Sequence, residues 1–299
     1  MDPALRLEKL RRTFDPCVQC PRACRARRLQ DEAGECGVGR HALVSSYGPH
    51  FGEEPVLVGI HGSGTVFFAG CNLRCVYCQN YEISQWRLGN PVGARELAAI
   101  FLRIQEMGCH NLNLVTPSHV VYPIVEALEL ARAEGFRLPV VYNTSAYDSV
   151  ATLRLLDGLM DIYMPDTKYM DPEKAARYSG RRDYPRVMQK ALKEMHRQVG
   201  DLVIRNGLAV RGLLVRHLVL PNGLSDTRRV IDFLVEEISP DTYLNLMDQY
   251  YPTYQAHRYP ELSRRITARE YREAVEYALS RGIHRGIPFE DLKHARFGR

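Results

Sequence analysis

The chain has 299 residues, of which 45% are hydrophobic and 25% are charged, as expected for an ordinary soluble globular protein. This length can bury a substantial core as one large domain, or as one domain with a small appendage. The formal net charge of +5 is modest, which favours a solvated surface over a patch for an acidic partner. Because the chain starts with charged residues and has no run of the ~18 apolar residues that a membrane span needs, we expect a cytoplasmic protein without a membrane partner.

Half of the eight cysteines lie near the N-terminus, as Cys17, Cys20, Cys24 and Cys36. In a cytoplasmic protein, where thiols stay reduced, such a group favours metal ligation over disulfides. Four thiolates can form a closed zinc site or hold a [4Fe-4S] cluster, and the spacing does not distinguish the two. Neighbouring prolines and glycines predict an irregular segment with little helix or strand. We therefore expect residues 1–60 to form a cysteine-rich metal-binding segment, with a glycine-rich connector over residues 41–63.

A second set of cysteines, Cys71, Cys75 and Cys78, follows the apolar run 65–69 in a C-x3-C-x2-C spacing. Three thiolates at this spacing can meet at one small object, for which zinc and an iron–sulfur cluster are the candidates. Structural zinc takes four protein ligands, and no fourth Cys or His follows Cys78 nearby. A cubane held by three cysteines leaves one iron open to bind a small molecule and transfer an electron. The alternative is an accidental grouping of three core thiols.

The run FFAGCNLRCVYCQN, residues 67–80, resembles the signature of the radical SAM superfamily. It is most similar to the pyruvate formate-lyase activating enzymes and their uncharacterised homologues. The resemblance implies that the three cysteines hold a [4Fe-4S] cluster whose open iron binds S-adenosylmethionine (SAM). One electron then cleaves SAM to methionine and a 5′-deoxyadenosyl radical, which abstracts hydrogen from a substrate. It also implies that Tyr77 lies near the adenine and that Asn80 contacts SAM.

From residue 65 onward, short apolar runs alternate with amphipathic helical patterns. The predicted strands cover residues 65–69, 111–116, 138–142, 160–164, 213–220 and 242–247. The predicted helices cover residues 94–107, 118–134, 148–157, 185–199, 226–237 and 268–281. This alternation predicts an α/β fold with a parallel sheet covered by helices. Six units are too few for a closed eight-stranded barrel, so we expect a partial (β/α)6 barrel over residues 61–285, as the resemblance also implies, and a C-terminal tail over residues 286–299.

Ligands of parallel α/β folds bind at the C-terminal ends of the strands. The polar residues at these ends that we expect to bind SAM are Thr116, Ser118, Asn143, Asp166 and Lys168. Asp166 and Lys168 are two residues apart, so they point the same way and suit a zwitterionic ligand. They also resemble a D-x-K element of the activating enzymes. Helix caps and turns favour the same residue types, which is the alternative for Ser118.

The chain departs from the activating enzymes in two places. Those enzymes carry Gly-Gly-Glu for the SAM amino group where this chain has Val115-Thr116-Pro117-Ser118, so we expect the hydroxyl of Thr116 or Ser118 to serve instead. Activating enzymes with extra clusters carry the additional cysteines after the main motif, whereas here they precede it. Among the histidines, His119 is expected nearest the site, and His217, inside an apolar strand, is expected in the core.

These patterns predict a radical SAM enzyme, with activation of a glycyl radical enzyme as the favoured reaction. Modification of another peptide, an RNA or a small molecule is the alternative within this class. The chemistry requires a reductase or flavodoxin-type electron donor and admits a protein substrate. A nucleic-acid-binding protein built on the basic cysteine segment is disfavoured, because only Phe14 and Tyr47 are near for base stacking. A barrel aldolase or hydrolase would need an acid–base constellation that the sequence does not offer.

Overall fold

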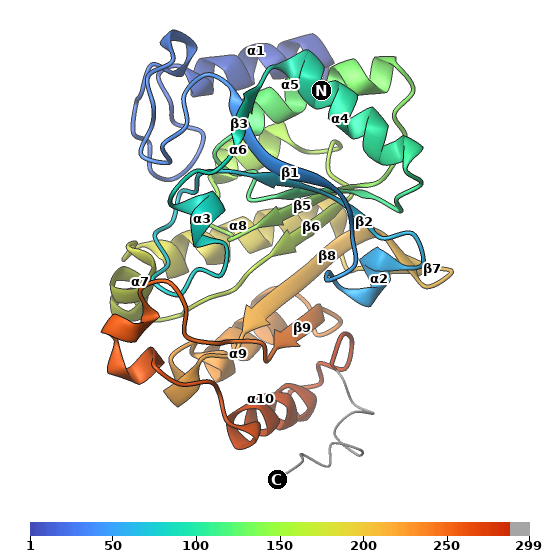
Figure 1. Ribbon diagram of the computed structural model, residues 1–299. Helices are drawn as coiled ribbons and strands as arrows, with labels where there is room; N and C mark the ends of the chain where they lie inside the picture. The colour runs from blue at the N-terminus through green and yellow to red at the C-terminus, as the bar shows by residue number, and fades with distance from the viewer. Residues whose placement is uncertain (288–299) are drawn as a thin grey trace.

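The computed structural model describes residues 1–287; residues 288–299, which include most of the predicted tail 286–299, lie outside the described part. A nine-stranded sheet runs through the described residues in the order β3-β1-β2-β4-β5-β6-β8-β7, and β9 pairs with β8 (Figure 1). Its parallel strands are β2 (Ser63–Phe68), β4 (Leu112–Val115), β5 (Val140–Thr144), β6 (Ile162–Pro165), β8 (Leu208–Leu218) and β9 (Tyr243–Met247). All six predicted strands are therefore confirmed.

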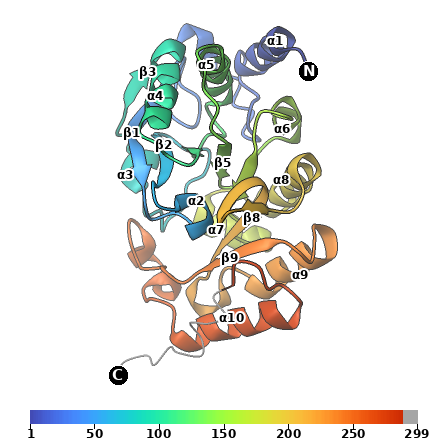
Figure 2. The ribbon, with the colours of Figure 1, turned by 90° about the vertical axis from the view of Figure 1, so that its right-hand side faces the viewer.

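Helices lie between successive parallel strands and cover the outer face of the sheet. They are α4 (Ala94–Glu106), α5 (Val121–Ala133), α6 (Val150–Leu155), α8 (Tyr184–Val199), α9 (Thr227–Glu237) and, after β9, α10 (Ala268–Ser280). Figure 2 shows them in an arc around the strands. Since β2 and β9 do not pair within residues 1–287, the sheet stays open. The fold is the predicted partial (β/α)6 barrel.

A helix between β6 and α8 was not predicted. Helix α7 (Pro172–Ser179) follows β6; Pro172 stands in its first turn, and its N-cap Asp171 accepts a hydrogen bond from the Glu173 amide at 2.7 Å. It ends at Gly180, whose φ of +71° closes the helix in the left-handed region. The Asp-Pro start and glycine stop are sequence signals that would have identified it.

The glycine-rich connector predicted over residues 41–63 contains a strand that was not predicted, β1 (Ala42–His50), which pairs antiparallel with β2 and, on its other side, with β3 (Asn90–Val92). Only the first part of β1 alternates buried and half-buried residues, and none of its later residues is buried, so the period-two signal of a strand is weak. Another antiparallel strand, β7 (Val203–Arg205), forms a hairpin with β8. The Asn206-Gly207 turn between them has positive φ at both residues.

The N-terminal segment begins with an unpredicted helix, α1 (Pro3–Phe14), whose Leu10 and Phe14 are fully buried. Residues 15–41 are irregular, as predicted, apart from one turn of 3-10 helix at η1 (Arg28–Gln30). In Figure 1 this segment lies on the same side of the molecule as α7 and α3 (Tyr81–Ser84), where β8 ends. The cysteine-rich segment therefore adjoins the carboxyl edge of the parallel sheet.

The remaining elements are short. They are α2 (Pro55–Val58) and the 3-10 turns η2 (Pro221–Gly223), η3 (Ala256–Arg258) and η4 (Pro260–Leu262). Helix α2 and β7 lie on the side of the molecule opposite to α3 and α7 (Figure 1). Among the described residues, no helix is both long enough and apolar enough to cross a membrane.

Candidate active site

The loop after β2 carries Cys71, Cys75 and Cys78, and several segments fix its course. At Gly70 the backbone has a φ of +83°, and a Cβ there would lie 2.8 Å from the Cys36 carbonyl oxygen, so only glycine fits this turn. The Arg74 and Val76 amides donate to the carbonyls of Ser179 and Tyr178 at 3.1 and 2.9 Å. Helix α7, which ends at Ser179, thus positions the cysteine loop.

Each of the three thiols has a hydrogen-bond partner. Cys75 Sγ lies 3.1 Å from the Ser179 hydroxyl and Cys78 Sγ lies 3.2 Å from the Ser84 hydroxyl, and Cys71 Sγ accepts from the Leu73 amide at 3.3 Å. Burial raises the pKa of Cys71 to about 12, and the other two thiols add to the shift. The free thiol is therefore protonated at neutral pH, and metal binding releases that proton.

The three cysteines line one cavity of about 260 Å³ at the carboxyl ends of the strands. Within residues 1–287, no three His, Cys, Asp or Glu side chains are placed to hold a single metal ion. A cubane takes each thiolate on a different iron, so its ligands need not meet at one ion. Three thiols on one cavity wall, each with a hydrogen-bond partner, fit the [4Fe-4S] cluster predicted from the sequence, with room beside it for a ligand.

Six of the seven residues predicted to bind SAM line this cavity: Tyr77, Asn80, Thr116, Asn143, Asp166 and Lys168. They come from the cysteine loop and from the ends of β4, β5 and β6. The Tyr77 hydroxyl bonds that of Tyr169 in the buried wall. The tertiary structure therefore assembles, around the cysteines, donors and acceptors suited to an amino acid head, a ribose and an adenine.

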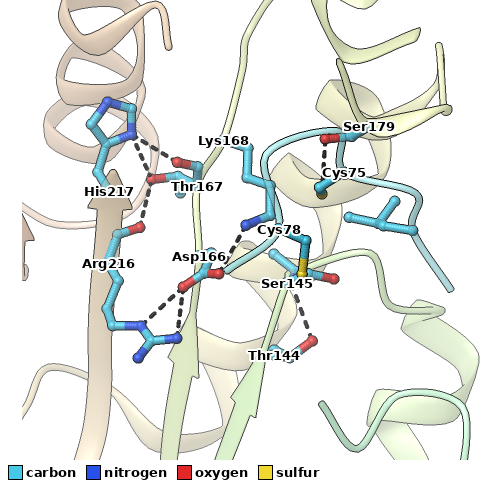
Figure 3. A network of polar contacts seen from close by, with 12 residues as sticks. Cys75, Cys78, Thr144, Ser145, Asp166, Thr167, Lys168, Ser179, Arg216 and His217 are labelled. Carbon is cyan, nitrogen blue, oxygen red and sulfur yellow. Dashed lines mark hydrogen bonds and ion pairs between the residues drawn. The ribbon is translucent and has the colours of Figure 1, made fainter. Parts of the chain in front are cut away.

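A charged network crosses the cavity floor (Figure 3). Lys168 Nζ lies 2.9 Å from Asp166 Oδ2, and the Arg216 guanidinium lies 2.9 Å from Asp166 Oδ1. Arg216 also donates to Asn143 Oδ1 at 2.8 Å and reaches Glu53 at 3.5 Å. Burial disfavours the charged form of Asp166, but Arg216 and Lys168 outweigh it and hold its pKa below the ordinary value. Asp166 is consequently ionised at neutral pH.

Thr116 adopts a strained conformation where it faces the cavity, with a φ of +62°. A β-branched residue rarely occupies the left-handed region, and such strain concentrates at ligand-binding sites.

Ser118, which was also predicted to bind SAM, does not line the cavity. Its hydroxyl lies 2.9 Å from that of Thr144, which donates to Asp148 at 2.6 Å, and it is buried. Ser118 belongs to a polar cluster behind the β5 end because the chain turns away after Pro117.

His119, the histidine expected nearest the site, does not line the cavity. His119 is buried behind the cysteine loop, where Nε2 bonds the Ala69 carbonyl at 2.8 Å. His217, in contrast, is the core residue expected: Nδ1 donates to the Thr167 carbonyl at 2.7 Å and Nε2 accepts from the Thr227 hydroxyl at 2.9 Å. Burial lowers the pKa of each histidine to about 4.

Sequence reasoning missed several cavity residues, of which Arg216 is the charged one. Ser84, Leu218 and Met247 are among the others. The signal for Arg216 was available, because an arginine within the apolar strand run 213–220 requires a buried counter-charge. Ser84, on α3, gave no comparable signal, since it stands in a segment without a regular pattern.

An open parallel barrel whose cysteine loop and polar strand ends share one cavity defines a cofactor-dependent α/β enzyme. Residues 65–213 match the family model of the Radical SAM superfamily. The chain is also 32% identical over 286 residues to the uncharacterized protein MJ0674 of Methanocaldococcus jannaschii. This alignment covers 92% of the present chain and 77% of MJ0674. The chain belongs to the radical SAM superfamily, whose members use a [4Fe-4S] cluster and SAM.

Solved structures share the fold at low sequence identity. Streptococcus suis SuiB bound to the precursor peptide SuiA aligns with a TM-score of 0.50 and 13% identity over 72% of this chain. The enzyme anSMEcpe, with bound AdoMet and Cp18Cys peptide, aligns with a TM-score of 0.51 and 12% identity over 76% of this chain. The match covers only 45% and 58% of those two longer chains.

Proposed function

We propose that this radical SAM enzyme generates a 5′-deoxyadenosyl radical to abstract hydrogen from a protein or peptide substrate, with a backbone glycine as the favoured target. The observation that carries the proposal is the single cavity shared by the three cysteines and the Asp166–Lys168 pair. These cysteines would hold a [4Fe-4S] cluster, which would supply the electron for SAM cleavage and would itself be reduced by a reductase or flavodoxin-type protein.

The chain's own residues bind and orient the ligand. Burial lowers the pKa of Lys168, but Asp166 and Cys75 outweigh it and raise the pKa, so the ammonium group stays charged. It is suited to bind the carboxylate of SAM. The Asp166 carboxylate and the Thr116 hydroxyl offer acceptors for an ammonium group. Tyr77 forms an apolar wall beside Cys78. Together these groups fit the two charged ends of the methionine part of SAM.

An aromatic surface next to the cavity supports a macromolecular substrate. Tyr81, which follows the cavity residue Asn80, stacks on Tyr254 at 5.0 Å and meets Trp86 edge-on at 4.9 Å. The Trp86 side chain is 56% exposed. Exposed aromatic groups beside a cavity are typical of partner-binding surfaces, and two solved proteins of this fold hold a peptide.

The first experiment measures SAM cleavage by anaerobically reconstituted protein with dithionite. Wild type should release 5′-deoxyadenosine, and Cys78→Ala should release none. Cys109→Ala is the matched control, because Cys109 is buried outside the cavity and should leave cleavage unchanged. Continued cleavage by Cys78→Ala would refute the assignment.

A second experiment identifies the hydrogen donor. The enzyme is incubated with SAM, dithionite and a protein fraction from the source organism grown on glycine deuterated at Cα. Deuterium in the released 5′-deoxyadenosine supports abstraction from glycine. Label that arrives only from other deuterated amino acids, from RNA or from small molecules would instead establish the alternative substrates.

A further inference from the structure

The four N-terminal cysteines lie together in space as well as in sequence. A Cβ on Gly34 would lie 3.0 Å from Cys24 Sγ and 3.5 Å from Cys36 Sγ, so these two thiols flank the same glycine. Cys17 and Cys20 are buried, and all four are free. The charges of Cys17, Cys24 and Cys36 each act on the Cys20 thiol. The irregular segment therefore wraps its four thiols around one region.

A buried cation stands beside these thiols. The Arg28 side chain is fully enclosed, and its Nη1 lies 3.8 Å from Cys17 Sγ. The remaining contacts of Arg28 are neutral: Nε donates to the Gly39 carbonyl, Nη1 to the His119 carbonyl, and the guanidinium covers the Phe14 ring at 4.4 Å. Its Nη2 has no hydrogen-bond partner. No carboxylate pairs with Arg28 in the described residues, although a buried charge needs a counter-charge.

A second arginine of this segment also has an unpaired N–H donor. Arg22 lies between Cys20 and Cys24 in the sequence, and its side chain is 8% exposed. It pairs with Glu35, yet its Nη2 is buried without a hydrogen-bond partner. The unpaired N–H donor of Arg28 against Cys17, and that of Arg22 in the same segment, indicate a missing anionic group that accepts hydrogen bonds.

The cysteine segment also touches the catalytic loop directly. Arg22 Nε donates to the carbonyl of Asn72, the neighbour of Cys71, at 2.6 Å. Arg74 from the catalytic loop donates to the Glu35 carbonyl. The Gly70 backbone packs on the Cys36 carbonyl, because a Cβ there would lie 2.8 Å away. A group held by these four cysteines would therefore sit next to the first cluster.

We propose that Cys17, Cys20, Cys24 and Cys36 hold a second [4Fe-4S] cluster, fully ligated by protein, whose negative charge Arg28 compensates. A four-thiolate cubane carries a net charge of about −2 and has sulfides that accept hydrogen bonds, which matches the unpaired guanidinium groups. Zinc would instead need the four thiols to meet at one ion at about 2.3 Å, so the metal and sulfide content of the protein distinguishes the two kinds of site.

Metal and sulfide analysis of wild type and two variants tests this proposal. Anaerobically reconstituted wild type should contain about eight irons and eight sulfides per chain, and Cys71→Ala/Cys75→Ala/Cys78→Ala should keep about four of each. Cys20→Ala/Cys36→Ala should keep only the first cluster. About four irons with one zinc in wild type, or four irons with no second metal, would overturn the proposal. Because wild type alone decides this, misfolding of a variant leaves the test intact.

Electron paramagnetic resonance separates this proposal from the proposed function. The reduced triple variant Cys71→Ala/Cys75→Ala/Cys78→Ala should show a [4Fe-4S] signal that added SAM does not change, because all four irons have cysteine ligands. In Cys20→Ala/Cys36→Ala, SAM should alter the remaining signal. A SAM-sensitive signal in the triple variant would overturn the second site, whereas a SAM-insensitive signal in the double variant would count only against the proposed function.

The role of Arg28 has its own readout, the midpoint potential of the second cluster in the triple variant. Removing a buried positive charge disfavours the more negative reduced cluster, so Arg28→Gln should shift the potential to more negative values, and Arg28→Lys should restore much of it. Arg27→Gln is the matched control, since that neighbouring side chain is 66% exposed. An unchanged potential in Arg28→Gln would refute charge compensation by Arg28.

Discussion

Asp166, just after β6, and Arg216, in β8, form an ion pair at 2.9 Å beneath the candidate SAM cavity. Asp166 also pairs with Lys168, and Arg216 reaches Glu53 on its other side. Arg216 therefore compensates two carboxylates at once. Burial raises the pKa of Glu53 although the charge of Arg216 opposes this shift. This part of the network is therefore shielded from bulk water. Its charges hold the cavity floor in one arrangement before any ligand binds.

Removing Arg216 should destabilise the protein strongly. Arg216→Met leaves Asp166 with Lys168 alone and Glu53 without its cation, and breaking a buried pair costs about 3–5 kcal/mol of unfolding free energy. Urea unfolding under anaerobic conditions measures the change. Arg103→Ala is the control, because its pair with Glu106 is about 60% exposed and is worth less than about 1 kcal/mol. Equal losses in the two variants would contradict the role of Arg216.

Lys168 should matter for SAM affinity more than for cluster assembly. A hydrogen bond to a charged group is worth about 1.5–3 kcal/mol, so Lys168→Met should raise the dissociation constant of SAM roughly 10- to 100-fold. Equilibrium dialysis on reconstituted protein measures binding, and iron content should stay at the wild-type value. The exposed Lys9→Met serves as control. An unchanged SAM affinity in Lys168→Met would exclude this residue from the binding site.

Replacing the strained Thr116 with glycine should raise the stability of the protein and weaken SAM binding. Thr116→Gly removes a side chain from a positive-φ residue and should raise the unfolding free energy by about 1 kcal/mol. The same change removes the hydroxyl that faces the cavity, so SAM binding should weaken. Asn206→Gly provides the comparison, since Asn206 has a φ of +51° in the β7–β8 turn and tolerates it. Normal SAM binding by Thr116→Gly would show that the Thr116 hydroxyl does not contact SAM, and an unchanged unfolding free energy would show that the positive φ stores no strain.

The buried His217 predicts a pH-dependent stability. Its pKa is lowered to about 4 by burial, against about 6.5 in the unfolded chain, so between these values the unfolded state binds more protons. The contribution is fully present above pH 6.5 and is lost as the pH falls toward 4. Urea unfolding between pH 7.5 and 5 should therefore show a steeper decline for wild type than for His217→Gln. Parallel pH profiles would show that His217 does not titrate in this way.

Local patterns in the sequence were enough to predict the parallel strands and the main helices between them. Apolar runs such as 138–142 are buried on both faces of a central strand, so their signal does not depend on distant residues. Strand β1 was missed for the opposite reason: none of its last five residues is buried, and its pairing with β2 on one side and β3 on the other stabilises it. Helix α7 was missed although its Asp171-Pro172 start and Gly180 end were readable.

The sequence by itself determined which cysteines could bind a cluster and which strand ends would surround it, because spacing along the chain and the common edge of parallel strands are local properties. Only the tertiary structure decided that Thr116 faces the cavity while Ser118 turns into the core, and that Arg216 completes the charge balance of Asp166. It alone placed Arg28 against Cys17 and the N-terminal segment against the catalytic loop. Burial and charge pairing join residues far apart in the chain, and no local pattern records such contacts.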